Sequence, residues 1–113
     1  MAINKELLKG STVILILTLL DRKDMYGYEM IKEIELKSEG IFKFKEGTLY
    51  PILHSLEEER FVECYWLEAE GSRKRKYYKI TKGGKEILKE KQEEWKAFRT
   101  AVDKVIWEGC VQG

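Results

Sequence analysis

Residues 46–60 read EGTLYPILHSLEEER, and this stretch decides the fold. Its large apolar residues recur at i, i+3, i+4 and i+7, which is the spacing of one face of an α-helix. They are Leu49, Ile52, Leu53 and Leu56. Pro51 lacks an amide hydrogen and belongs in the first turn or just after it, so Thr48 or a residue slightly before it is expected to cap the helix. We predict a helix over residues 46–60 with its leucine face in the core.

The opposite face of this helix is small and polar. It carries Gly47, Pro51, His54, Ser55 and Glu58, with Tyr50 on a flank. Such a surface lets a helix approach base edges closely, while its hydroxyl and imidazole groups exchange hydrogen bonds with phosphates and bases. Residues 57–59 are all Glu, and this charged end is expected to lie away from DNA because recognition helices contact bases with their N-terminal half. An ordinary solvated amphipathic helix is the alternative interpretation.

Two more helices are predicted upstream. Residues 4–20 are rich in Leu and Ile without strict alternation and run too long for a strand, which predicts a mostly buried helix. Asp24 is expected to cap a second helix that continues to residue 37 and ends before Gly40. The apolar face of that helix is formed by Tyr26, Met30 and Ile34.

The chain changes character after residue 60. Residues 61–68 are rich in β-branched and aromatic side chains, which favours a strand, and Trp66 is expected in the core of a hairpin. A turn at residues 70–72 and an alternating stretch over residues 75–80 predict a second strand that pairs back on the first. Three helices followed by a hairpin is the order of a winged helix, a mainly α fold whose third helix can enter the major groove of DNA.

The predicted hairpin carries a local concentration of positive charge. Residues 73–79 include five Lys or Arg in seven positions, although the net charge of the protein is only +1. Such a patch suits phosphate groups, and a solvated basic strand is the alternative. With the third helix, it predicts binding to double-stranded DNA. The predicted DNA contacts are Lys45, Gly47, Thr48, Tyr50, Pro51, His54, Ser55, Arg73, Lys74, Arg75, Lys76 and Tyr77.

Thr81 is expected to cap a last helix that reaches about residue 108. Its apolar residues follow a heptad pattern that only Lys91 breaks, and a projecting apolar seam of this kind is expected to be covered by a second copy of the chain. Packing of the helix back onto its own domain is the alternative. We therefore predict a DNA-binding domain over residues 1–80 and a dimerisation helix over residues 81–113. The predicted homodimer interface consists of Leu8, Leu88, Trp95, Phe98, Val102, Val105 and Ile106.

Residues 46–57 resemble the signature of the PadR family of transcription regulators. The resemblance extends to YGYE at residues 26–29, to RKRKYY at residues 73–78 and to Thr81 with Gly84, so it covers nearly the whole chain. The short length and single C-terminal helix are similar to the smaller PadR subgroup, which includes multidrug-responsive repressors.

The resemblance implies a functional scheme. Members of this subgroup dimerise through the last helix, bind pseudo-palindromic operators and commonly repress transcription. In some of them a tryptophan on that helix lines a pore at the dimer interface where planar aromatic compounds stack, and Trp95 matches it by its Glu-Glu-Trp setting. Packing within the dimer seam is the alternative role of Trp95. The expected function is a sequence-specific repressor whose DNA binding is relieved by a planar aromatic small molecule.

The composition argues against other classes of protein. A single His, two Cys without a C-x-x-C pair and no nucleophile motif predict no catalytic site, no metal site and no cofactor. The strongest apolar run, residues 13–20, falls short of the ~20 residues that span a bilayer, and no secretory signal is recognised, so a cytoplasmic location is expected. A winged-helix module that binds proteins, with only non-specific affinity for DNA, is the alternative function.

Overall fold

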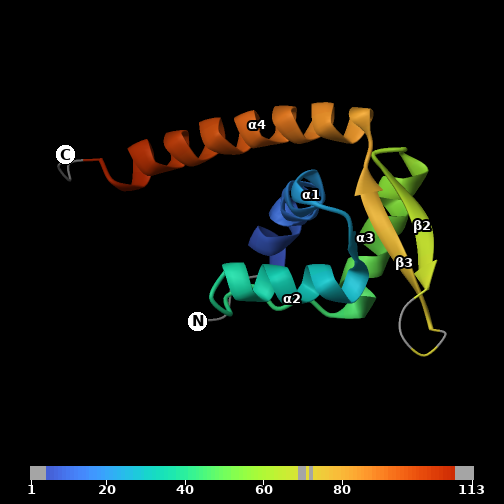
Figure 1. The fold of residues 1–113 in the computed structure, drawn as a ribbon. Coiled ribbons are helices and arrows are strands. Elements are labelled where there is room, and N and C mark those ends of the chain that lie inside the picture. The colour runs from blue at the N-terminus through green and yellow to red at the C-terminus, as the bar shows by residue number, and fades with distance from the viewer. Residues whose placement is uncertain (1–4, 69–70, 72, 109–113) are drawn as a thin grey trace.

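The computed structural model describes residues 5–68, 71 and 73–108, with side chains from residue 10 onward in these ranges. The elements are α1 (Lys5–Arg22), β1 (Met25–Tyr26), α2 (Gly27–Lys37), α3 (Glu46–Glu58), β2 (Val62–Glu68), β3 (Lys74–Ile80) and α4 (Lys82–Ile106). Three helices precede a hairpin and a long last helix, as Figure 1 shows, which confirms the predicted winged-helix order. Only β1 has no counterpart in the sequence prediction.

Helix α1 lies in the centre of the molecule, between α2 and α4 (Figure 1). Because neighbours cover several of its sides, its apolar residues need no single stripe, and Ile16, Leu17 and Leu20 are almost completely buried. The leucine face of α3 meets the same core through Leu49 and Leu53, both with no exposed surface. The predicted burial of both helices is confirmed.

The three strands form an antiparallel sheet in the order β1-β3-β2. The two residues of β1, Met25 and Tyr26, pair with β3 just before α2 begins. Asp24 therefore does not cap α2 as predicted: the cap position is Tyr26, which makes no side-chain capping bond. Instead, the Tyr65 hydroxyl donates a hydrogen bond to Asp24 Oδ2 at 2.6 Å, which ties β2 to the segment that leads into α2.

Backbone hydrogen bonds close the ends of α2 and α3. Gly40 has a φ of +81° and donates its N–H to the Glu35 carbonyl at 2.8 Å, which confirms that this glycine takes part in ending α2. Arg60 has a φ of +64°, and the Phe61 N–H bonds the Leu56 carbonyl at 2.9 Å. This second reversal leads the chain directly from α3 into β2.

Helix α3 begins at Glu46, as predicted. Its cap position is Lys45, again without a side-chain capping bond, and Thr48 lies within the first turn, where its N–H reaches the Lys45 carbonyl at 3.0 Å. The cap is therefore a residue slightly before Thr48, which is the second of the two positions that the prediction allowed. Pro51 lies inside the helix, just after its first turn, as predicted.

Helix α4 is capped as predicted, because Thr81 Oγ1 accepts a hydrogen bond from the Gly84 N–H at 3.0 Å. Its first turns pack on α1, where Leu88 is buried and Gln92 donates a hydrogen bond to Thr18 Oγ1 at 3.3 Å. From residue 92 to residue 108 every position is exposed. The alternative in which this helix folds back onto its own domain therefore holds only for its first half, and the second half projects into solvent (Figure 1).

Candidate nucleic-acid interface

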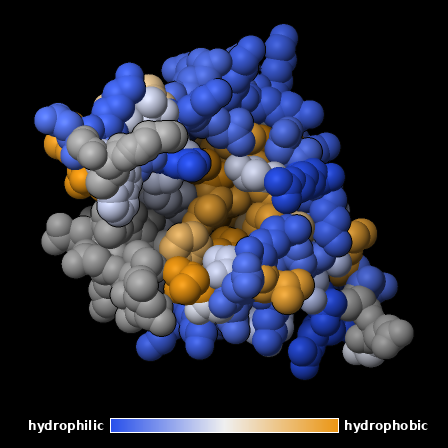
Figure 2. All heavy atoms as spheres, turned by 90° about the vertical axis from the view of Figure 1, so that its left-hand side faces the viewer, coloured by the Kyte–Doolittle hydropathy of each residue, from blue (hydrophilic) through white to orange (hydrophobic). Residues whose placement is uncertain are grey.

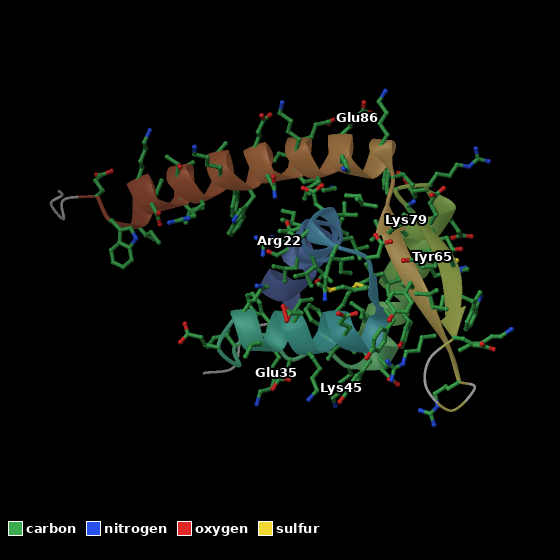
Figure 3. The ribbon with its side chains drawn as sticks, in the orientation of Figure 1. Arg22, Glu35, Lys45, Tyr65, Lys79 and Glu86 are labelled. Carbon is green, nitrogen blue, oxygen red and sulfur yellow. The ribbon has the colours of Figure 1, made fainter. Side chains whose placement is uncertain are left out.

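The N-terminal end of α3 and the far end of the hairpin lie at the same edge of the molecule. In Figure 1, β2 runs down beside α3 and β3 returns, so that the pair Glu68 and Lys74 lies at the lower edge. Figure 3 places Lys45, the residue before α3, at this edge too. The acidic C-terminal end of α3 lies at the opposite edge, beside the start of α4 (Figure 1). The two segments predicted to bind DNA therefore face one side together.

The predicted DNA-facing positions of α3 form a continuous solvent-exposed surface. Every one of them is exposed in the structure: Lys45, Gly47, Thr48, Tyr50, Pro51, His54 and Ser55. Tyr50 is 39% exposed, and its ring rests on the backbone of Gly27 at the start of α2. Partial burial raises the pKa of the Tyr50 hydroxyl, so this group stays a neutral donor and acceptor at physiological pH.

A groove of about 490 Å³ separates α3 from the hairpin. Its walls combine aromatic rings with two cationic side chains and one imidazole. They are formed by Tyr26, Gly27, Tyr50, His54, Trp66, Arg75, Lys76 and Tyr78. Four of these residues, Tyr26, Gly27, Trp66 and Tyr78, are absent from the predicted DNA contacts. We call this feature the α3–hairpin groove.

Trp66 corrects the sequence prediction. It was expected in the core of the hairpin, but its side chain is 61% exposed. Val62 and Cys64 precede it on the same face of β2, and these two are buried and half-buried, whereas Trp66 lies further along the strand, where the α3–hairpin groove lies between the hairpin and α3. The strand register places Trp66 opposite Lys76, a pairing that would have signalled a position in the basic hairpin.

The basic residues of the hairpin differ in their surroundings. Arg73 and Lys74 are exposed. The Arg75 guanidinium lies over the Tyr26 ring, 4.5 Å from its centroid, and is half-buried. This stacking restricts the position of a cation that also lines the groove.

Glu57 joins α3 to the hairpin. Its Oε2 accepts a hydrogen bond from the Cys64 thiol at 3.0 Å, and its Oε1 lies 3.5 Å from Lys76 Nζ. The thiol hydrogen bond, helped by the charge of Lys76, lowers the pKa of Glu57, and the same thiol bond raises the pKa of Cys64. Glu57 is thus not the plain charged helix end that was predicted, although Glu58 and Glu59 are exposed.

Tyr77 lies with other tyrosines rather than in the groove. Its ring stacks on Tyr65 at a centroid distance of 5.7 Å and meets the edge of Tyr26 at 5.4 Å. The neighbouring Tyr78 points the other way and is 5% exposed. The structure therefore brings every other predicted hairpin contact toward the edge shared with the N-terminal end of α3 or toward the groove, but places Tyr77 in this tyrosine cluster.

The projecting half of α4 carries an exposed apolar strip. It consists of Trp95, Phe98, Val102, Val105 and Ile106, with exposures between 37% and 76%, and Trp107, which follows the helix, is 60% exposed. Leu88, which was predicted to belong to the same seam, is 4% exposed and packs in the core of its own chain, so the strip begins at Trp95. Leu8 falls within α1, but its side chain lies outside the described residues. Figure 2 shows the face toward which α4 projects, where apolar side chains gather in a recess rimmed by polar ones.

The described residues contain neither a membrane-spanning helix nor a cluster of metal-ligating side chains. No helix among them is long and apolar enough to cross a membrane. No group of three or more His, Cys, Asp or Glu side chains in the same ranges is arranged to hold a metal ion.

Residues 16–90 match the protein-family model described as Transcriptional regulator PadR-like family. The chain belongs to the PadR-like family. It is 36% identical over 101 residues to an uncharacterized protein of Lysinibacillus sphaericus, with 89% of this chain and 93% of that protein covered. It is also 34% identical over 85 residues to the transcriptional regulator YqjI of Escherichia coli, with 75% of this chain but only 39% of YqjI covered.

Solved PadR-like structures share the fold. A transcriptional regulator from Clostridium thermocellum has a TM-score of 0.82 and 34% identity, covering 88% of this chain and 97% of that one. A PadR-like transcriptional regulator from Bacillus cereus has a TM-score of 0.81 and 30% identity, covering 94% and 100%. PadR-family proteins are transcriptional regulators that act through DNA, not enzymes, which confirms the predicted class of function.

Proposed function

We propose that this PadR-family protein is a homodimeric repressor that binds a pseudo-palindromic operator. The observation that carries the proposal is the shared edge formed by the N-terminal half of α3 and the basic end of the hairpin (Figure 1). A helix in the major groove would present Tyr50, His54 and Ser55 to base edges, and the hairpin cations would contact phosphates. We propose that the protein binds this duplex DNA in the cytoplasm.

The proposed dimer rests on the apolar strip of α4. Trp95, Phe98, Val102 and Val105 share one face of the helix and have no partner among the described residues that would bury them. A strip of this length on a projecting helix is typical of an interface between two copies, since it would otherwise stay in water. In this proposal residues 1–80 bind DNA and residues 81–113 dimerise.

The proposed effector is a planar aromatic small molecule at the dimer interface. The rings of Trp95 and Phe98 lie 6.2 Å apart at an angle of 26°, and both are partly exposed, so they offer a flat apolar surface for stacking. Titration with a panel of planar cationic dyes tests this idea. Quenching of tryptophan fluorescence, together with a loss of operator affinity, is expected, and fluorescence that no dye changes would contradict it.

The DNA-binding proposal is tested by fluorescence anisotropy at several salt concentrations. Labelled duplex from upstream of the protein's own gene is compared with a scrambled duplex of the same composition. Preference for the upstream duplex and a steep fall in affinity with added salt are expected because phosphate contacts release counterions. Weak binding that does not distinguish any genomic duplex from the scrambled one would favour the protein-interaction module instead.

Two substitutions separate base contacts from phosphate contacts. Tyr50→Ala is expected to weaken binding to the operator more than binding to scrambled duplex, since Tyr50 lies on the exposed face of α3. Lys76→Ala is expected to weaken both about equally and to flatten the salt dependence. Equal losses from both substitutions would contradict these roles.

A further inference from the structure

We propose that the α3–hairpin groove seats one sugar–phosphate strand of the bound DNA, with the indole of Trp66 lying against a deoxyribose. The inference rests on the proposed DNA-binding function and deepens it. It states what occupies the groove, and it assigns a DNA contact to Trp66, which the sequence analysis had placed in the core of the hairpin.

When α3 lies in the major groove, as proposed above, the geometry of a duplex places one of its strands between α3 and the hairpin. The major groove of B-DNA, about 12 Å wide, is separated from the neighbouring minor groove, about 6 Å wide, by a single sugar–phosphate backbone. A protein that inserts α3 into the major groove and the hairpin into the next minor groove must straddle that backbone. The space between the two elements is the α3–hairpin groove, of about 490 Å³.

The groove walls suit a phosphate. Arg75 and Lys76 contribute positive charge from the hairpin, and His54 and Tyr50 contribute hydrogen-bonding groups from α3. Lys76 Nζ lies 3.5 Å from Glu57 Oε1. This ion pair restricts the Lys76 side chain to a position beside the groove. The net charge of the chain is only +1, so this local charge, rather than the overall charge, would attract the strand.

Trp66 suits the sugar between two phosphates. Its indole is 61% exposed, lines the groove and pairs in register with Lys76. A large flat apolar ring between cationic groups can cover the carbon-bound hydrogens of a deoxyribose while its neighbours hold the phosphates. Leu67, the next residue, is 48% exposed but points to the other face of the strand, so it serves as a matched control.

The experiment compares Trp66→Ala, Trp66→Phe and Leu67→Ala in the full-length protein, by anisotropy with the operator duplex and with scrambled duplex. Trp66→Ala is expected to weaken both complexes by about five- to tenfold, since aromatic contacts to nucleic acid are lost without any change in charge. Its salt dependence should equal that of the wild type, whereas Arg75→Gln should reduce the slope by about one. Trp66→Phe should recover most of the affinity, and Leu67→Ala should stay within about twofold of the wild type.

Three outcomes would overturn the proposal while leaving the DNA-binding function intact. One is wild-type affinity in Trp66→Ala. Another is a loss confined to the operator duplex, since that would make Trp66 a base reader. The third is a groove that takes a small aromatic anion, seen as salicylate binding that Trp66→Ala abolishes without any change in duplex affinity. A wild-type protein that binds no duplex at low salt would instead refute the proposed function itself.

Discussion

The ring of Tyr50 lies so close to Gly27 that a β-carbon on that glycine would be 2.5 Å from Tyr50 Cε1 and 2.6 Å from the hydroxyl oxygen. The absence of a side chain at the start of α2 therefore sets where the Tyr50 ring of α3 rests. Gly27 and Tyr50 both line the α3–hairpin groove, so this contact links helix packing to the surface proposed to bind DNA.

Gly27→Ala is expected to reduce operator affinity with little loss of stability. The displaced atoms belong to the end of a side chain that is 39% exposed, so the ring can rotate outward, and the free energy of unfolding should change by less than ~1 kcal/mol. Operator affinity should fall about tenfold because Tyr50 leaves its position. Urea unfolding and anisotropy measure the two effects. Gly10→Ala, where a β-carbon would meet no described atom within 4 Å, is the control for a glycine replaced in a helix, and a large stability loss in Gly27→Ala would refute this assignment.

Gly84→Ala is expected to behave in the opposite way and destabilise the fold. A β-carbon at Gly84 would overlap the backbone carbonyl oxygen of Phe61 and lie 2.7 Å from Ile80 Cγ1, at the base of the hairpin. Backbone cannot rotate away, so the free energy of unfolding should fall by about 2 kcal/mol or more. The neighbouring Gly83→Ala is a matched control, because its β-carbon would meet nothing closer than Thr81 Oγ1 at 3.7 Å. Gly83→Ala should stabilise the helix by up to ~1 kcal/mol, and equal melting temperatures for the two variants would contradict the prediction.

The sequence predicted α3 and β3 because burial along each of them follows a regular period. The leucine face of α3 and the alternation along β3 both appear in the structure because one side of each element enters the core. The two residues of β1 are too few to show any period, so Asp24 was interpreted as a helix cap when it is a hydrogen-bond acceptor for Tyr65.

The exposed polar residues of the candidate site could be predicted from the sequence. The surroundings of its apolar residues could not, because they depend on which element covers them. Exposure of the polar face of α3 followed from its opposition to the leucines. Trp66 and Leu88 were assigned the wrong surroundings for one reason: periodicity identifies an apolar face but not the element that covers it. The α3–hairpin groove lies beside Trp66 and leaves it exposed, whereas α4 lies on α1 for its first turns and buries Leu88.

Phe98→Glu is expected to convert the proposed dimer into monomers. Phe98 is 62% exposed in the middle of the apolar strip of α4, so a carboxylate there would be buried without a partner when two copies associate. Light scattering across a concentration series measures the mass. Thr100→Glu adds the same charge to an exposed position on the opposite side of the helix and should leave the dimer intact. A dimeric Phe98→Glu protein would place the interface elsewhere.

Tyr65 is expected to make stability depend on alkaline pH. The hydrogen bond that its hydroxyl donates to Asp24 raises the pKa of Tyr65 to about 12, against ~10 in an unfolded chain. Because the folded pKa is raised, the stabilisation is fully present below pH ~10 and is lost as the pH rises toward about 12. The stability difference between the wild type and Tyr65→Phe, from urea unfolding, should therefore stay constant up to pH ~10 and shrink above it. Asp24→Asn removes the charged acceptor and should lower the Tyr65 pKa toward its ordinary value, which the ultraviolet absorbance of tyrosinate reports. A difference that does not change on going to high pH would show that the Tyr65 and Asp24 pair does not contribute to the stability of the hairpin.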